Sequence, residues 1–173
     1  MVIIWFVGII ILIFGFVVFF GAPYVPSHKK QVERALKELY DLQSSDLLID
    51  VGSGDGIVLR MAARKGAKAV GYELNPILVL ISTLLARSYG SKIRIHLADF
   101  WHVALPEETT VVYVFTVERD VAKITSKIQA ETNRLSHPLF LISYGASFPT
   151  MKPVRTIGAH HLYSFTPLQG PLT

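Results

Sequence analysis

The strongest constraint on the fold lies in residues 47–56, where an apolar run enters a glycine-rich turn. Leu47–Val51 is apolar except for Asp50, which is the pattern of a strand buried on both faces. Three glycines follow at a spacing of two: Gly52, Gly54 and Gly56. A helical pattern then begins at Ile57. Because glycine accepts positive φ and has no Cβ, its backbone can approach a ligand closely, so this stretch predicts a nucleotide-binding site.

The spacing of the glycines separates two kinds of nucleotide site. The dinucleotide fingerprint is G-x-G-x-x-G, with a pyrophosphate at the helix N-terminus. Here the run is G-x-G-x-G, with Asp50 before the first glycine and Asp55 inside the turn. Carboxylates are poor neighbours for a pyrophosphate but suit a ligand that carries an ammonium and a sulfonium. The spacing therefore favours such a cation, and NAD is the less favoured alternative.

Two further carboxylates stand at the ends of the next predicted strands. Glu73 follows the apolar run 67–72, and a carboxylate there can accept hydrogen bonds from both hydroxyls of a ribose. Asp99 follows the predicted strand 93–97, with Phe100 and Trp101 directly behind it. Three carboxylates at the ends of successive strands are a much more specific signal than the glycine turn alone.

The segment Asp50-Val-Gly-Ser-Gly-Asp-Gly56 resembles motif I of the class I S-adenosylmethionine-dependent methyltransferases. The resemblance implies that Asp50 lies near the methionyl amine of S-adenosylmethionine and that the turn passes beneath this cofactor. It also implies that Asp99 accepts from the adenine amino group and that an apolar neighbour covers the ring. The cofactor-binding residues expected are Asp50, Gly52, Ser53, Gly54, Gly56, Glu73, Leu74, Asn75, Asp99 and Phe100.

Several strings together resemble a narrower family, the small membrane-anchored protein-lysine methyltransferases. The strings are Pro-Tyr-Val-Pro-Ser (23–27), Gly-Tyr-Glu-Leu-Asn-Pro (71–76), Asp-Phe-Trp (99–101) and Val-Phe-Thr-Val (114–117). Mitochondrial members of that family modify the c-ring protein of ATP synthase and the adenine nucleotide translocator. The resemblance implies a protein lysine as the methyl acceptor. The chain departs from the family pattern at 117–120 and 143–149, the regions that would choose the acceptor.

An acceptor lysine must be neutral, so an aromatic, desolvating pocket with one hydrogen-bond acceptor is expected. Candidate substrate-contacting residues are Tyr24, Glu118 and Tyr144. Tyr113 and Phe115 are further candidate walls, although the pattern alone favours core packing for both. No catalytic residue is assigned, because an in-line transfer mainly requires alignment and exclusion of water.

The N-terminal part carries a different signal. Residues 1–27 contain no charged side chain, and Val2–Phe20 would form an apolar helix of roughly 28 Å. We expect a single membrane anchor over residues 1–21. A signal peptide and a buried helix are the alternatives. Basic residues follow the run within a short distance: Lys29, Lys30, Arg34 and Lys37. The positive-inside tendency then predicts that the catalytic domain lies on the cytoplasmic side.

The remaining chain predicts an α/β fold. Residues 22–43 are expected to form a linker and a helix that ends near Leu42, and residues 44–173 the methyltransferase domain. Strands alternate with helices, which predicts a doubly wound, Rossmann-like sheet of seven mostly parallel strands. Helices are expected at 57–64, 75–89 and 118–134. Strand 93–97 has the alternation of an edge strand and 110–115 the character of a central strand, and an antiparallel hairpin is expected at 154–165.

Composition limits the other classes of function. The chain has no cysteine and its six histidines lack metal-binding spacing, so we expect no metal site. The net charge of +4 is mild and lacks a dense basic run, which argues against nucleic acid as a partner. Two alternative functions stay open at this point. One is a methyltransferase with a small-molecule or lipid acceptor, and the other is a non-catalytic nucleotide-binding scaffold on the membrane.

Overall fold

The computed structural model describes residues 4–5, 8 and 29–168. The expected membrane anchor, the linker that follows it and Tyr24 lie outside these residues, apart from three positions near the start of the chain. Within the described ranges, none of the helices combines the length and the apolar character needed to cross a membrane.

Helices and strands alternate through most of the chain. The helical elements are α2 (Lys29–Arg34), the π-helical turn η1 (Ala35–Leu39), α3 (Ile57–Arg64), α4 (Pro76–Ala86), α5 (Val121–Leu135) and three 3-10 turns, η2 (Arg87–Lys92), η3 (Phe100–His102) and η4 (Glu118–Asp120). The strands are β1 (Leu47–Val51), β2 (Lys68–Glu73), β3 (Ile93–Leu97), β4 (Val111–Thr116), β5 (Leu139–Gly145), β6 (Arg155–Ile157) and β7 (His160–Phe165).

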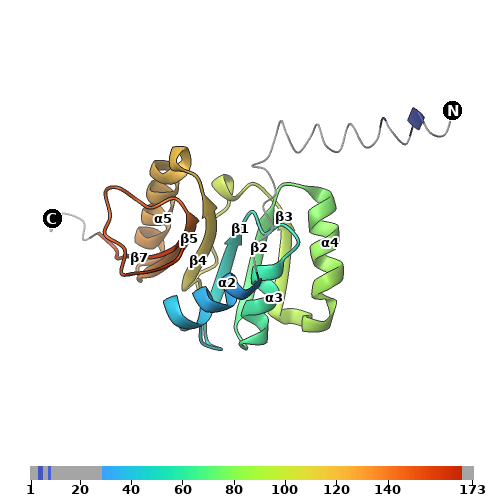
Figure 1. Cartoon of the computed structure of the whole chain (residues 1–173), viewed down its shortest axis with the longest axis horizontal. Helices are drawn as coiled ribbons and strands as arrows, with labels where there is room; N and C mark the ends of the chain where they lie inside the picture. Colours follow the sequence, from blue (N-terminus) through green and yellow to red (C-terminus); the bar gives the residue numbers. More distant parts are fainter. Residues whose placement is uncertain (1–3, 6–7, 9–28, 169–173) are drawn as a thin grey trace.

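The seven strands form one sheet in the order β3-β2-β1-β4-β5-β7-β6 (Figure 1). Strands β1 to β5 are parallel, and β7 runs antiparallel between β5 and β6. The predicted mostly parallel sheet with a C-terminal antiparallel hairpin is therefore confirmed. Strand β3 lies at one edge of the sheet and β4 in its interior, as their sequence patterns predicted.

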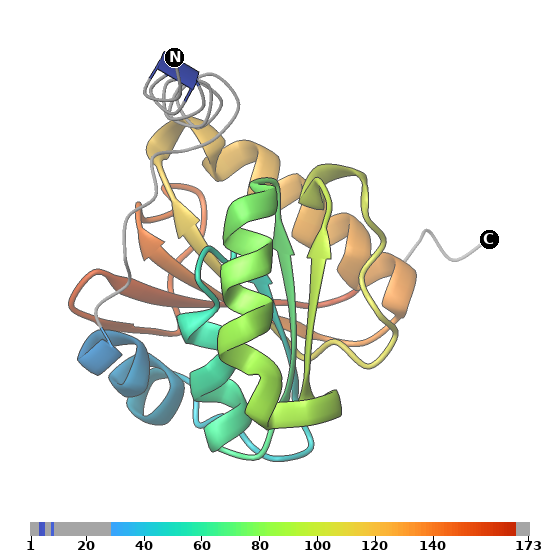
Figure 2. The same cartoon turned by 90° about the vertical axis from the view of Figure 1, so that its right-hand side faces the viewer.

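Neighbouring strands β1 and β4 are not consecutive in the chain, so the strand order reverses between them. In open α/β sheets, ligands bind at the carboxyl ends of the strands beside such a reversal. The register places Asp50 of β1 between Gly71 of β2 and Tyr113 of β4. The carboxyl ends of β1, β2 and β4 consequently meet at one edge of the sheet, as the arrowheads in Figure 2 show.

Helices cover both faces of the sheet. Helices α2, α3 and α4 lie on one face, and α5 lies on the other (Figure 2). Helix α2 and turn η1 contribute Val32, Leu36 and Leu39 to the core beneath α3, and all three are almost completely buried. The helix before the first strand is thus an integral part of the packed domain, held there by apolar burial.

The structure differs from the sequence-based expectations at three places. Helix α4 ends at Ala86 instead of near Tyr89, because the chain tightens into η2 and then turns at Gly90, which has a φ of 57°. The helix expected from Glu118 begins with the 3-10 turn η4 and becomes α-helical at Val121. Leu97 was expected to point inward with its strand neighbours, yet it is 59% exposed, because it lies at the open end of an edge strand.

Candidate functional site

The glycine turn after β1 needs residues without a Cβ. All three glycines have φ in the left-handed region, between 54° and 77°, which other residues adopt only with strain: Gly52, Gly54 and Gly56. The amides of Gly52 and Ser53 both donate to the carbonyl oxygen of Tyr72, at 2.9 and 3.1 Å. The turn is thereby fixed to β2 as well as to β1.

Gly71 of β2 allows the turn to pack closely against the sheet. A Cβ at this position would lie 2.6 Å from Ser53 Oγ and 2.7 Å from Leu59 Cδ1, which is closer than real contacts allow. The Ser53 side chain therefore packs against β2. Its hydroxyl is buried and has no hydrogen-bond partner among the described residues. Ser53 thus shapes the turn by packing, and its backbone amide binds Tyr72.

Glu73 joins the glycine turn to the start of α4. Its Oε2 accepts from the amide of Gly54 at 2.9 Å, and its Oε1 accepts from the amide of Asn75 at 2.8 Å. Asn75 in turn caps α4 by accepting from the amide of Ile77 at 2.9 Å. Each oxygen of a carboxylate has two acceptor sites, so Glu73 can still accept hydrogen bonds from two hydroxyls of a ligand. Leu74, directly beside it, is exposed.

Asp50 is the most buried carboxylate at this edge, with 4% of its surface exposed. Burial raises the pKa of Asp50 to about 8, and the negative charges of Glu73 and Asp55 act in the same direction. Asp55 itself forms an ion pair with Arg60 at 3.3 Å. A turn without Cβ atoms above a buried, carboxylate-rich floor fits a ligand that presents an ammonium group. It does not fit a pyrophosphate.

Asp99 lies just beyond the carboxyl end of β3 and caps η3. One of its oxygens accepts from the amide of Trp101 at 3.1 Å, and the other lies 3.1 Å from Nδ1 of His102. The ring of Phe100 is only 5% exposed and packs between Tyr72 and Trp101 in the core. Asp99 thus remains accessible at the cofactor edge, whereas the ring of Phe100 mostly serves the core and offers little surface to a ligand.

A second group of residues lies at the carboxyl ends of β4 and β5, and we call it the aromatic cluster: Tyr113, Phe115, Tyr144 and His160. Tyr144 stacks on His160 with their ring centres 4.5 Å apart, and its hydroxyl donates to Gln31 Oε1 of α2 at 3.3 Å. Phe115 packs edge-on against Tyr144 and is 38% exposed. The expectation of core packing is correct for Tyr113 and wrong for Phe115.

His160 was not among the sequence-based candidates. It is buried, and its Nε2 lies 2.8 Å from the hydroxyl of Tyr113. Burial lowers the pKa of His160 to about 4, with a further contribution from the neighbouring His161, so the imidazole is neutral at pH 7. Only the pairing of β5 with β7, which sets Tyr144 opposite His160, reveals this position.

Of the other substrate-side candidates, Tyr144 belongs to the aromatic cluster and Glu118 does not. Glu118 is exposed at the first residue of η4, just after β4. Tyr24 lies outside the described residues. Across residues 4–5, 8 and 29–168, no group of histidines and carboxylates is arranged to hold a metal ion.

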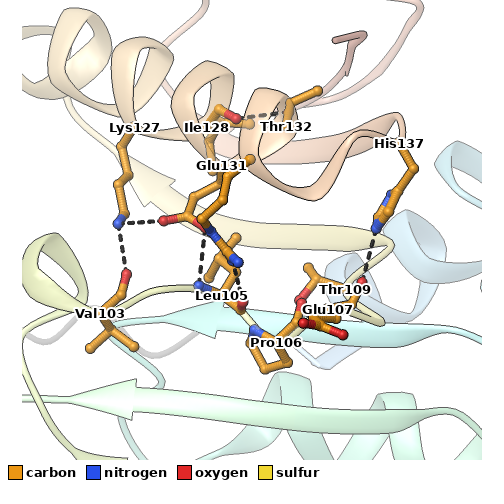
Figure 3. A network of polar contacts seen from close by, with 11 residues as sticks. Val103, Leu105, Pro106, Glu107, Thr109, Lys127, Ile128, Glu131, Thr132 and His137 are labelled. Carbon is orange, nitrogen blue, oxygen red and sulfur yellow. Dashed lines mark hydrogen bonds and ion pairs between the residues drawn. The ribbon is translucent and has the colours of Figure 1, made fainter.

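A buried charge network holds the loop that leads from Asp99 to β4 (Figure 3). Glu131 of α5 accepts from Lys127 at 2.8 Å, from Arg134 at 2.7 Å and from the amide of Leu105 at 3.2 Å. Lys127 also donates to the carbonyl of Val103 at 2.6 Å. Burial alone would raise the pKa of Glu131, but the hydrogen bonds from Lys127 and Arg134 outweigh it and lower the pKa. The network fixes the loop behind the cofactor edge to α5.

Comparisons with known proteins agree with this geometry. The family model of the ANTKMT methyltransferase domain matches residues 50–155, from Asp50 to the start of β6. The human lysine N-methyltransferase that is named for the C protein of ATP synthase is 35% identical over 138 residues, which are 79% of this chain and 57% of that protein. A protein-lysine N-methyltransferase of Saccharolobus islandicus is 29% identical over 122 residues, 66% of this chain and 75% of that protein. The chain thus spans less than two thirds of the human relative.

Solved structures share the same fold. The crystal structure of an RNA methyltransferase from Salinibacter ruber, in complex with S-adenosyl-L-homocysteine, superposes with a TM-score of 0.72 at 28% identity. The similarity covers 86% of this chain and 98% of that one. A Thermus thermophilus protein described as hypothetical superposes with a TM-score of 0.62 at 22% identity, over 84% of this chain and 90% of that one.

Proposed function

This chain belongs to the ANTKMT methyltransferase domain family, and from this membership we propose that it transfers a methyl group from S-adenosylmethionine to a lysine of a protein. One observation carries the proposal. The buried Asp50 and the turn-bound Glu73 flank a glycine turn at the carboxyl edge of the sheet. The names of the human and Saccharolobus relatives, both lysine N-methyltransferases, support the choice of acceptor.

Each residue of the cofactor edge has a distinct role in the proposal. When bound, S-adenosylmethionine supplies a methyl group that its sulfonium has already activated. Asp50 would hold the ammonium end of the ligand, and Glu73 would accept from the ribose hydroxyls while its bonds to Gly54 and Asn75 keep the turn in place. Asp99 is the candidate for the adenine side. These residues bind and orient, and the chain then needs no strong acid or base at the donor.

The acceptor side has to present a neutral amine. With a pKa near 10.4, deprotonating a lysine at pH 7 costs about 4.6 kcal/mol, and an apolar site lowers this cost by disfavouring the ammonium. The exposed ring of Phe115 and the half-buried ring of Tyr144 supply such a wall beside the ends of β4 and β5. His160 behind them is uncharged at pH 7, so it adds no repulsion to an approaching cation.

The proposal also includes the membrane. The uncharged run Val2–Phe20 has the length of a membrane anchor, and the basic residues after it favour a cytoplasmic catalytic domain. An anchored enzyme would meet lysines of membrane proteins, as the name of the human relative suggests for its own substrate. Protease digestion of sealed vesicles tests this topology. Exposure of the domain on the cytoplasmic side supports it, and complete protection there contradicts it.

Calorimetric titration of the full chain in detergent tests the cofactor. S-adenosylmethionine and S-adenosylhomocysteine should bind, NAD should not, and Glu73→Ala should lose the binding. Glu108→Ala is the matched control, because Glu108 is an exposed carboxylate in the loop before β4. Binding of NAD alone would overturn the methyltransferase assignment.

Transfer of a labelled methyl group tests the acceptor. Membrane fractions incubated with the enzyme and methyl-labelled S-adenosylmethionine should yield labelled methyl-lysine after acid hydrolysis. Label that is lost on ribonuclease treatment would instead point to an RNA acceptor, and label extracted with the lipids to a lipid acceptor. Cofactor binding without any transfer would favour the non-catalytic scaffold.

A further inference from the structure

The outer face of α4 is an exposed apolar surface that the cofactor site does not use. Seven of the twelve large hydrophobic side chains that are exposed among the described residues fall between positions 74 and 97. They are Leu74, Ile77, Leu80, Ile81, Leu84, Leu85 and Leu97, and we call them the α4 surface. A cluster of this kind on a single helix marks a contact with a partner or a membrane.

The spacing of these residues follows from the helix. Positions 77, 80, 81, 84 and 85 recur at intervals of three and four, so they share one face of α4, whereas Ser82 and Ala86 point to the core. Figure 2 shows α4 lying across the outside of the sheet. The helix has eleven residues and no charged side chain. At about 16 Å it is too short to cross a bilayer, but it can lie along one.

The charges around this surface are of one sign. The segment from Leu74 to Ala98 contains no aspartate or glutamate. Its three basic residues, Arg87, Lys92 and Arg94, are all exposed. A purely apolar partner would not require this bias. An anionic lipid surface does, because it attracts nearby lysine and arginine side chains.

We propose that the α4 surface lies in the interfacial layer of an anionic membrane, with its leucines and isoleucines toward the acyl chains and its basic residues at the headgroups. The run Val2–Phe20 in the same chain is consistent with a membrane location, and stable attachment of a protein to a bilayer commonly needs two such signals. A second copy of the chain fits less well, since a two-fold interface would bring the same basic side chains together.

The position of the α4 surface gives the contact a consequence for the active site. Helix α4 starts at Asn75, whose amide is held by Glu73, and Leu74 and Leu97 stand at the carboxyl ends of their strands. Docking of this surface would keep the cofactor edge close to the headgroup layer. It would thus fix the orientation of the domain relative to the bilayer, which a flexible tether alone does not do.

Fluorescent labelling of the full chain in vesicles tests the proposal. Because the chain has no cysteine, Leu84→Cys and Leu80→Cys can each carry one environment-sensitive dye. Both side chains are more than half exposed, so the exchange leaves the core intact. Ser126→Cys on α5, on the opposite face of the sheet, is the matched control. The vesicles contain phosphatidylcholine with or without phosphatidylglycerol, and a nitroxide carried on the acyl chains serves as quencher.

The proposal predicts a blue-shifted emission and strong nitroxide quenching at positions 80 and 84 in anionic vesicles, and neither change at position 126. Replacing Arg87, Lys92 and Arg94 by glutamine should remove the difference between anionic and neutral vesicles. Unshifted, unquenched dyes at 80 and 84 would overturn it. So would a blue shift that nitroxide lipids do not quench, because this result would show that protein, either a second copy or another segment of the chain, covers the surface.

Discussion

At the scale of single residues, Asp50 has the strongest consequence for binding. In the free protein its pKa is raised to about 8, so the carboxyl is mostly protonated at pH 6 to 7. A bound ammonium favours the carboxylate, and binding therefore releases a proton. We expect the affinity for S-adenosylhomocysteine to rise between pH 6 and 7.5, by up to about tenfold per pH unit. Calorimetry in buffers of different ionisation enthalpy measures both the affinity and the proton release.

The ligand-free protein provides an independent measurement of the same pKa. A carboxyl whose folded pKa lies above its unfolded value of 3.8 stabilises the fold less as the pH rises from about 4 to about 8. Asp50→Asn should remove this loss, so the variant gains stability relative to wild type at pH 8.5 and shows little difference at pH 4. The gain is at most several kcal/mol, at about 1.4 kcal/mol per pH unit. Parallel stability curves of the two proteins would contradict the raised pKa.

Gly71 tests how tightly the turn packs on β2. Gly71→Ala would press its Cβ against Ser53 and Leu59, and we expect a loss of about 1–3 kcal/mol in the free energy of unfolding. Cofactor affinity should fall with it, because the turn is displaced. Adding Ser53→Gly removes one of the two clashes and should restore part of both losses. Thermal denaturation and calorimetry of the single and double variants decide the matter, and an unchanged single variant would exclude the tight packing.

Local sequence predicted the carboxylates of the site, because a strand and the residue that ends it are close in the chain. Asp50 and Glu73 were found in this way. The neutral His160 could not be found, since its partner Tyr113 lies 47 residues away and the contact depends on the register of an antiparallel return strand. The inward packing of Ser53 was equally hidden, because it follows from the absence of a Cβ on another strand.

At the scale of elements, the junction between α5 and the loop before β4 depends on one buried carboxylate. Glu131→Ala would leave Lys127 and the amide of Leu105 without their acceptor, and we expect a loss of about 2–4 kcal/mol. The pKa of Glu131 is lowered by folding, so its contribution is present at neutral pH and fades as the pH falls through that pKa. Urea denaturation of wild type and variant at pH 7 and pH 3.5 should therefore show the larger difference at pH 7.

Glu107→Ala is the control for this experiment, as an exposed carboxyl in the same loop. It should change stability little at either pH. An equal loss for Glu107→Ala and Glu131→Ala would mean that the network contributes no more than an ordinary surface charge.

The elements themselves were largely predictable, but their ends were not. Buried strands such as β4 are continuous apolar runs, and this pattern survives without knowledge of the neighbours. The end of α4 depends instead on the tightening of the chain at Arg87 and the turn at Gly90. The exposure of α4 was also not decided by its pattern. A helix that is apolar nearly all round suits both a buried and a lipid-facing position, and only its place outside the sheet separates the two.

At the scale of the whole molecule, the packing of α2 and η1 predicts which truncations fold. Removing residues 1–28 leaves every residue of both core clusters in place. That variant should give a cooperative thermal transition close to that of the full chain. Removing residues 1–43 also deletes Val32, Leu36 and Leu39 from the core, and each large apolar side chain lost costs about 2–5 kcal/mol. We expect no cooperative transition for the second variant, as measured by circular dichroism, and a stable fold there would contradict the assignment.

The order of the sheet has a consequence for synthesis. Strand β7, the last in the chain, is inserted between β5 and β6, so one edge of β5 stays unpaired until residues 160–165 have left the ribosome. Strand β5 is almost entirely apolar, and an open apolar edge is a template for pairing with other chains. During translation the nascent chain therefore passes through a stage in which the cofactor edge of β1 and β2 is already encoded but the sheet is not closed. Chaperone protection matters most for this protein at that stage.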